Sequence, residues 1–257
     1  ASGDSPAGEV DAEFDASNLV IVPGLINCHH HFCQTLTRAF PAALNKELFP
    51  WLIELYPIWA GLDEDSIASS TELALAELML SGCTTASDHH YLFTDQITTA
   101  IDIQVSVAKR LGARVMLTRG SMSLGKSEGG LPPDNVVQDP DTILTESERL
   151  ISAYHDNGDN AYLQISLAPC SPFSVSPELM RDSAHLARQY GVLLHTHLGE
   201  TEDENNFCLS RFGKRPLDYL ADLGWLADDV WLAHGIHFND DEIHRLGKAG
   251  TAVTHCP

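Results

Sequence analysis

Two histidines one residue apart follow an apolar segment near the start of the chain. His29 and His31 come directly after VPGLINC (22–28). In extended backbone, residues two apart point to the same side, so His29 and His31 face one way and His30 faces the other. Neutral imidazole nitrogens are common ligands of divalent metals, zinc above all. A lone histidine would more often belong to the core or the surface, but this paired spacing predicts two ligands of one metal ion.

A second group of reactive side chains lies in HTHLGE (195–200), again after an apolar run. His197 is predicted to be a third nitrogen ligand. Glu200, three residues later, is expected in the following loop, where a carboxylate can move protons. His195 shares a face with His197 but lies one layer deeper. Two interpretations stay open for His195: it supports a ligand from behind, or it fills the core.

A third group, AHGIH (233–237), ends another apolar segment. Of its two histidines, His234 is the better placed for chemistry. All three groups follow segments that we predict to be strands. If those strands are parallel, their carboxyl ends meet at one edge of the sheet, and the three groups come together there.

Short apolar segments alternate with longer segments of helical spacing from residue 19 onward. The predicted strands are Leu19–Asn27, Cys83–His89, Arg114–Arg119, Tyr162–Pro169, Val192–Leu198, Val230–Ala233 and Thr251–His255. The predicted helices are Ser66–Ser81, Thr98–Leu111, Asp141–Asn157, Ser176–Tyr190, Pro216–Leu223 and Asp240–Ala249. Strict alternation is typical of a parallel sheet, and the polar groups at strand ends favour an α/β fold of the (β/α)8 TIM-barrel type. The alternative, a doubly wound open sheet, would carry a phosphate-binding glycine motif after its first strand, where histidines stand instead.

The number of predicted strands is one short of a closed barrel. Seven are predicted, whereas a closed barrel of this type has eight. An open barrel leaves two long edges, which natural proteins avoid. We therefore expect residues 19–257 to be an incomplete catalytic barrel that stops before strand eight, and residues 1–18 to be a remnant of an N-terminal β segment.

Composition restricts the partners of the chain. Acidic residues outnumber basic ones 36 to 15, and the net charge is -21. This charge opposes binding to phosphate backbones and anionic membranes, so neither nucleic acid nor a membrane is expected as a partner. Six cysteines without a C-x-x-C pair predict buried free thiols of a cytoplasmic protein, and residues 1–15 show no secretory signal. The oligomeric state stays open, with a homo-oligomer as one alternative.

Together the three motifs PGLINCHHH, HTHLGET and LAHGIHF resemble the amidohydrolase superfamily, in its branch of cytosine and guanine deaminases and triazine hydrolases. The resemblance implies a metal-dependent hydrolase in which His29, His31 and His197 bind the metal. It implies that Glu200 is the proton shuttle and that His234 orients and polarises water on the metal. It further implies a fourth ligand, an aspartate at the end of strand eight, for which this chain offers no residue. One divalent ion is expected, zinc by preference with iron as the alternative.

Longer segments resemble bacterial 8-oxoguanine deaminases, among them HHHFCQTLTRAFPAA and SGCTTASDHHY. This resemblance implies hydrolysis of a C–N bond in a cyclic amidine, 8-oxoguanine being converted to urate and ammonia. Gln34 matches a position that contacts the purine in guanine deaminases. The arginine that guanine deaminases carry after strand four is absent here, which makes Cys170 and Ser171 candidates for the substrate pocket. The alternative for these two residues is a simple turn.

Two other functions stay in view. The first is a triazine hydrolase, removing chloride or an alkylamine on the same scaffold, which only substrate profiling separates from a purine deaminase. The second is a non-catalytic barrel paralogue, which would typically have lost its histidine ligands. A cytidine deaminase would need H-x-E with P-C-x-x-C, and the chain contains no P-C-x-x-C.

Overall fold

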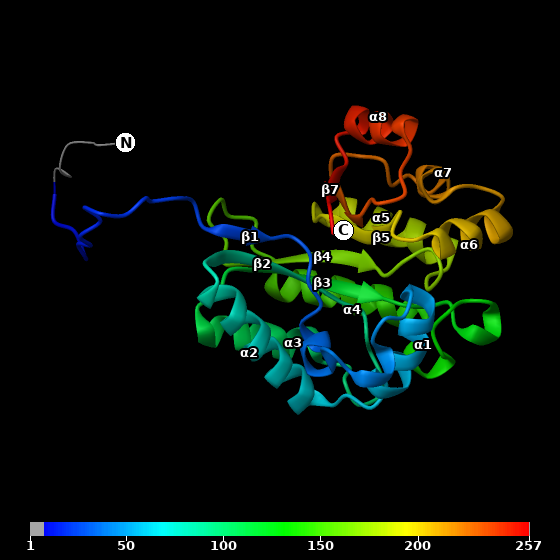
Figure 1. The fold of residues 1–257 in the computed structure, drawn as a ribbon, viewed down its shortest axis with the longest axis horizontal. Coiled ribbons are helices and arrows are strands. Elements are labelled where there is room, and N and C mark those ends of the chain that lie inside the picture. The colour runs from blue at the N-terminus through cyan, green and yellow to red at the C-terminus, as the bar shows by residue number, and fades with distance from the viewer. Residues whose placement is uncertain (1–7, 257) are drawn as a thin grey trace.

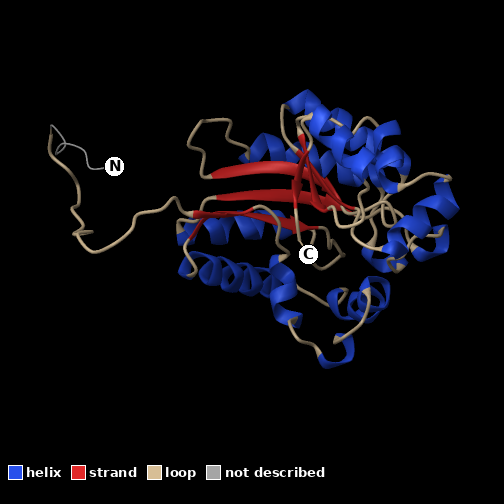
Figure 2. Cartoon of the chain, turned by 45° about the horizontal axis from the view of Figure 1, so that its top comes forward, coloured by secondary structure: helices blue, strands red, loops and turns tan. Residues whose placement is uncertain are grey.

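The computed structural model describes residues 8–256, which form one parallel sheet with helices against it (Figure 1). Seven strands follow one another in chain order, each paired in parallel with the next. They are β1 (Leu25–Asn27), β2 (Cys83–His90), β3 (Val115–Ser121), β4 (Leu163–Pro169), β5 (Leu194–Leu198), β6 (Val230–His234) and β7 (Ala252–Thr254). The sheet curls into a half-barrel (Figure 2), and the pairing order makes β1 and β7 its edge strands. The predicted α/β barrel-type fold is confirmed.

Eight α-helices accompany the sheet within residues 8–256. They are α1 (Leu48–Trp59), α2 (Glu64–Leu80), α3 (Ala100–Leu111), α4 (Pro140–Tyr154), α5 (Pro177–Tyr190), α6 (Glu202–Phe212), α7 (Pro216–Asp222) and α8 (Asp240–Ala249). The six predicted helices are present with small differences at their ends. No helix in this part of the chain is long and apolar enough to cross a membrane.

Local sequence signals explain where the predicted helices begin and end. In α5 the Ser176 hydroxyl accepts a hydrogen bond from the Leu179 N–H at 3.3 Å, and Pro177 occupies the first turn. The helix ends at Gly191, whose φ of 67° is in the left-handed region that glycine adopts without steric cost. Capping residues of this kind can be recognised in the sequence, which is why these helices were predictable.

Two helices were not predicted. α1 carries Pro57 in its interior and is apolar over most of its length, so no amphipathic pattern identified it. α6 begins directly after the HTHLGE motif, where Thr201 accepts a hydrogen bond from the Glu204 N–H. Its acidic first turn suits the positive end of the helix dipole.

The first strand is shorter than predicted. Only Leu25–Asn27 pairs with β2, and the preceding residues 19–24 form no strand. Leu25 and Ile26 are 60% and 67% exposed because β1 is an edge strand with a neighbour on one side only. Of the predicted N-terminal β segment, residues 1–7 lie outside the described residues and residues 8–18 form no strand, so that domain assignment stays a prediction.

The predicted state of the cysteines is largely confirmed. All six are free thiols, and four of them are buried. Cys28 is exposed because it follows the edge strand, and Cys256 is intermediate.

Close approach of β2 and β3 requires a glycine at position 120. A Cβ on Gly120 would lie 2.2 Å from the His90 carbonyl oxygen. Gly120→Ala should therefore push the two strands apart and lower the free energy of unfolding by about 1–3 kcal/mol. Gly247, in α8, is the matched control because a Cβ there meets nothing within 4 Å. Gly247→Ala should raise stability by about 0.5–1 kcal/mol. Urea denaturation of both variants checks this, and a Gly120→Ala protein as stable as the parent would contradict it.

Candidate metal centre

Four histidines from three strand ends converge at the carboxyl edge of the sheet. One ring nitrogen from each of His29, His31, His89 and His197 lies within 4.8 Å of the others. His29 and His31 follow β1, His89 is in β2 and His197 is in β5. The structure thus brings the three predicted ligands together. His89 was not predicted, although its position near the end of a strand, in SDHHY, is a signal of the same kind.

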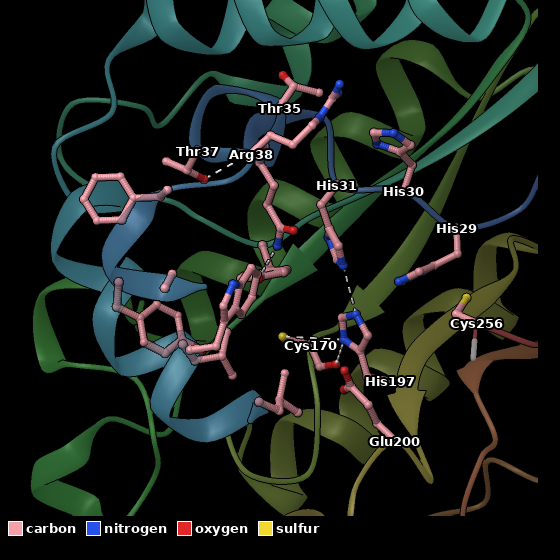
Figure 3. Close-up of a pocket in the computed structure, with 18 of the residues that line it drawn as sticks. His29, His30, His31, Thr35, Thr37, Arg38, Cys170, His197, Glu200 and Cys256 are labelled. Atoms are coloured by element: carbon pink, nitrogen blue, oxygen red, sulfur yellow. Dashed lines mark hydrogen bonds between the residues drawn. The ribbon is translucent and has the colours of Figure 1, made fainter. Parts of the chain in front are cut away.

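Hydrogen bonds to carbonyl groups determine which nitrogen of each ring carries the proton. The Nδ1 atom of His31 lies 2.7 Å from the His89 carbonyl oxygen, and that of His197 lies 2.7 Å from the Cys170 carbonyl oxygen. Because a carbonyl only accepts, both Nδ1 atoms are protonated and both Nε2 atoms carry a lone pair. These two Nε2 atoms are 3.1 Å apart, as the dashed line in Figure 3 marks. Two facing lone pairs repel each other, and a cation between them removes the repulsion.

His195 determines the proton position of His29 in the same way. Its Nδ1 donates to the Trp231 carbonyl oxygen at 2.7 Å, which leaves Nε2 as an acceptor. That Nε2 lies 2.8 Å from His29 Nδ1. His29 therefore keeps its lone pair on Nε2, as His31 and His197 do. Of the two interpretations of His195, this contact favours support of a ligand, although the ring is also fully buried and stacks on Trp231.

Burial keeps these imidazoles uncharged. It lowers the pKa of His31 to about 3, and it lowers the pKa of His29 and His197 far below the ordinary range. The neighbouring histidines lower the pKa of His29 and His197 further, because each would repel a second positive charge. Neutral nitrogens are the form that binds a metal, so the cluster is a set of donors suited to a divalent ion such as zinc.

Glu200 and His234 lie next to the cluster. Glu200 Oε1 is 3.4 Å from His234 Nε2. Burial, and to a smaller degree the nearby Glu204, raises the pKa of Glu200 to about 8. The Glu204 carboxylate accepts hydrogen bonds from the Gly199 N–H at 3.2 Å and the Glu200 N–H at 2.8 Å, which holds the loop that carries Glu200. The other histidine of this motif, His237, contacts a different carboxylate: its Nδ1 lies 2.9 Å from Glu202 Oε1.

The backbone of His234 is unusual. Its φ is 77°, in the left-handed region that residues with a Cβ rarely adopt. The following glycine, Gly235, is also left-handed, at 67°. Two successive left-handed residues end β6 sharply and place the His234 ring 5.4 Å from that of His197. Such strain is concentrated at functional sites in proteins.

A cavity of about 540 Å³ opens over the cluster. Its walls are mainly apolar and aromatic and come from η1 (Phe32–Thr37), the segment after it and α1 (Figure 3). Among the lining residues are His29, His31, Gln34, Phe40, Trp51, Tyr56, Tyr91, Cys170, Phe173, His197, Glu200 and His234. Such a pocket, apolar with a few polar groups at one end, suits a small heterocycle.

The predicted substrate contacts divide into two groups. Gln34 and Cys170 line the cavity, and Gln34 Nε2 donates to the Tyr91 hydroxyl at 3.3 Å. Ser171 is fully buried, is not among the lining residues and shares a 2.7 Å hydrogen bond with the Ser174 hydroxyl. For Ser171 this arrangement fits the alternative interpretation, a turn.

The chain is similar to known proteins over most of its length. Residues 20–257 match the model of the amidohydrolase family. The chain is 59% identical to 8-oxoguanine deaminase of Pseudomonas aeruginosa, over 100% of its own length and 57% of the relative. It is 42% identical to hydroxydechloroatrazine ethylaminohydrolase of Pseudomonas sp. strain ADP, over 93% of its own length and 50% of the relative.

A solved structure has the same fold. The atrazine chlorohydrolase of Arthrobacter aurescens TC1, complexed with zinc, superposes with a TM-score of 0.86 at 34% identity. The match covers 91% of this chain and 53% of that one, so the chain spans about half the length of the relatives that it matches. From this match over nearly the whole chain and from the histidine motifs, the protein belongs to the amidohydrolase family.

Proposed function

We propose that the protein containing this chain is a metal-dependent hydrolytic deaminase of a purine-type heterocycle, converting 8-oxoguanine to urate and ammonia. The observation that carries the reaction class is the convergence of unprotonated histidine nitrogens beside the Glu200 carboxyl at one end of the cavity. The similarity to 8-oxoguanine deaminase, at 59% identity, carries the choice of substrate.

In this proposal His29, His31 and His197 hold one divalent metal ion. The uncharged nitrogens that face one another fit such an ion, and zinc is supported by its presence in the related chlorohydrolase structure. Iron is the alternative, because imidazole ligands suit both metals. When bound, the ion supplies Lewis-acid chemistry, which makes water a nucleophile at neutral pH.

Glu200 moves the protons of the reaction. Its raised pKa of about 8 means that the carboxyl can hold a proton at neutral pH and exchange it within the active site. It would deliver this proton to the ring nitrogen beside the carbon that carries the amino group. Water adds to that carbon and loses both its protons, one to the amino group, which leaves as ammonia, and one back to Glu200, so that an oxo group replaces the amino group. His234, 3.4 Å from Glu200, would stabilise the oxygen that becomes this group.

The cavity orients the substrate. Aromatic side chains of the walls offer faces on which a planar ring stacks, and Gln34 offers an amide for its polar edge. Burial raises the pKa of the Cys170 thiol to about 12, so this residue stays a neutral thiol. It would contact substrate through packing and a weak hydrogen bond, not as a nucleophile.

The alternative is a triazine hydrolase, and the similarity to the ethylaminohydrolase and the chlorohydrolase favours it. Both functions use a planar nitrogen heterocycle and a metal, so the site described above serves either. We further propose that the protein acts in the cytoplasm on a small molecule, without nucleic acid or membrane partners, with a homo-oligomer as an open alternative. The free thiols and the acidic composition support these points.

Ammonia release tests the substrate. The protein that contains this chain is produced from its complete reading frame and loaded with zinc. It should release ammonia from 8-oxoguanine faster than from guanine, isoguanine, cytosine or hydroxylated aminotriazines. His197→Ala should abolish both the rate and the zinc content, since it removes a central ligand. A preference for a triazine would overturn the substrate and keep the reaction class. No turnover and no bound metal would favour the non-catalytic paralogue.

Glu200→Gln tests the proton shuttle. The amide keeps the shape of the side chain but cannot exchange a proton, so kcat should fall about 10²–10⁴-fold. KM and zinc content should change little, because Glu200 is not among the converging donor residues. Steady-state kinetics and metal analysis check this. A rate within about threefold of the parent would rule out the role.

Glu204 should make stability depend on pH. Burial raises its pKa to about 7 from 4.5, so the folded state holds the proton more tightly than the unfolded state does. The contribution of Glu204 to the free energy of unfolding is therefore fully present below the unfolded pKa and is lost as pH rises through about 7. The stability advantage of the parent over Glu204→Gln should shrink from about pH 5 to about pH 8, by up to about 3 kcal/mol. Glu202→Gln is the control. Glu202 lies on the exposed side of the same helix, and its pKa is lowered, whereas that of Glu204 is raised. An advantage that grows with pH in urea titrations would refute this.

A further inference from the structure

We propose that His89 is a fourth nitrogen ligand of the metal centre and binds through Nδ1. The inference rests on the metal centre of the proposed function and adds a residue from a strand, β2, that carries none of the predicted ligands. It rests on the position of the free lone pair of His89 beside those of His29, His31 and His197.

The hydrogen bonds of His89 place that lone pair on Nδ1. Its Nε2 lies 3.0 Å from the Ala168 carbonyl oxygen, which only accepts, so Nε2 carries the proton. The Nδ1 atom is fully buried and has no hydrogen-bond partner. A buried acceptor without a partner costs about 1–3 kcal/mol relative to a satisfied one. A cation at this position would satisfy it.

The ring of His89 is arranged like that of a ligand already assigned. It stacks on His197 with centroids 4.5 Å apart and an angle of 14° between the planes. Both rings donate an N–H to a carbonyl near the end of β4, His89 to Ala168 and His197 to Cys170. With the rings parallel and their N–H groups on the same strand end, the two lone pairs face the same space. Metal-binding histidines in proteins typically donate their other N–H in this way.

The neighbouring His90 shows which observation is decisive. It is equally buried, its Nε2 lies 2.7 Å from the Leu92 carbonyl oxygen, and its Nδ1 also has no partner. However, it points to the other face of β2, where it packs edge-on against Phe93, and it does not belong to the converging group. An unpartnered nitrogen alone is therefore not a ligand. The convergence of His89 with His29, His31 and His197 distinguishes the two.

Binding through His89 would leave the cavity open. His89 is not among the lining residues, whereas the other three are, so it approaches the centre from the core. The side of the centre that faces the cavity would stay open to water or substrate. The ion would then join β1, β2 and β5, and metal binding would stabilise the fold across these strands.

Cadmium NMR on the protein that contains this chain, produced from its complete reading frame, tests the inference directly. The probe is ¹¹³Cd bound to protein with ¹⁵N-labelled histidines. We expect one-bond coupling to Nε2 of His29, His31 and His197 and to Nδ1 of His89. In the same protein His89→Gln should weaken zinc binding by about 100-fold or more, beyond the loss typical of removing an outer hydrogen-bond partner. His90→Gln should leave the zinc affinity within about threefold, because His90 lies outside the group.

The outcomes separate the inference from the proposal that it deepens. Coupling to His29, His31 and His197 without coupling to His89 would overturn the inference and leave the metal centre in place. An affinity of His89→Gln equal to that of the parent would overturn it as well. Coupling to no histidine would refute the metal centre itself. If His89→Gln does not fold, the couplings of the parent protein still decide.

Discussion

The site depends on one constraint: each buried imidazole must place its single proton on an acceptor. Carbonyl groups near strand ends take the protons of His31, His89 and His197, and His195 takes that of His29. His29, His31, His89 and His197 each keep one lone pair, and one ring nitrogen from each lies within 4.8 Å of the others. Burial disfavours the charged form of these rings, and the lone pairs of uncharged nitrogens this close repel one another unless a cation lies between them. The protein thus maintains an arrangement that is unfavourable on its own and favourable around a metal.

Parallel topology makes this arrangement available. All strands of the sheet run the same way, so their carboxyl ends, with their unpaired carbonyl groups and side chains, are gathered at one edge. The helices cover the outer face and exclude water from the strands, which raises the cost of any charge there. Gly120, with no Cβ, lets β3 lie directly against the His90 carbonyl group of β2.

Acidic groups complete the site from the other side. Glu204 is buried beneath the loop after β5 and accepts hydrogen bonds from two of its N–H groups, which fixes the loop to α6. Glu200 is thereby held beside His234, and burial raises the pKa of both carboxyls. A carboxyl that titrates near neutral pH, next to uncharged nitrogens and under an apolar cavity, is equipped to transfer protons.

The sequence by itself determined the class of fold and the chemical character of the site. The alternation of apolar runs and helical segments indicated a parallel sheet, and the two-residue period of a strand placed His29 and His31 on one side. The spacing from His197 to Glu200 predicted that the carboxyl follows the strand end, and it does. These features are local, because side-chain direction within a strand depends only on neighbouring residues.

The tertiary structure alone decided what depends on distant partners. The proton on His195 is placed by the Trp231 carbonyl group, and the position of His89 next to the other histidines depends on the registers of β2 with β3 and of β3 with β4. Likewise, the short pairing of β1 and the placement of Ser171 in a turn follow from what lies beside them. A sequence pattern states which way a side chain points, but the proton on an imidazole is placed by an acceptor from another strand, and that acceptor is known only once the strands are aligned.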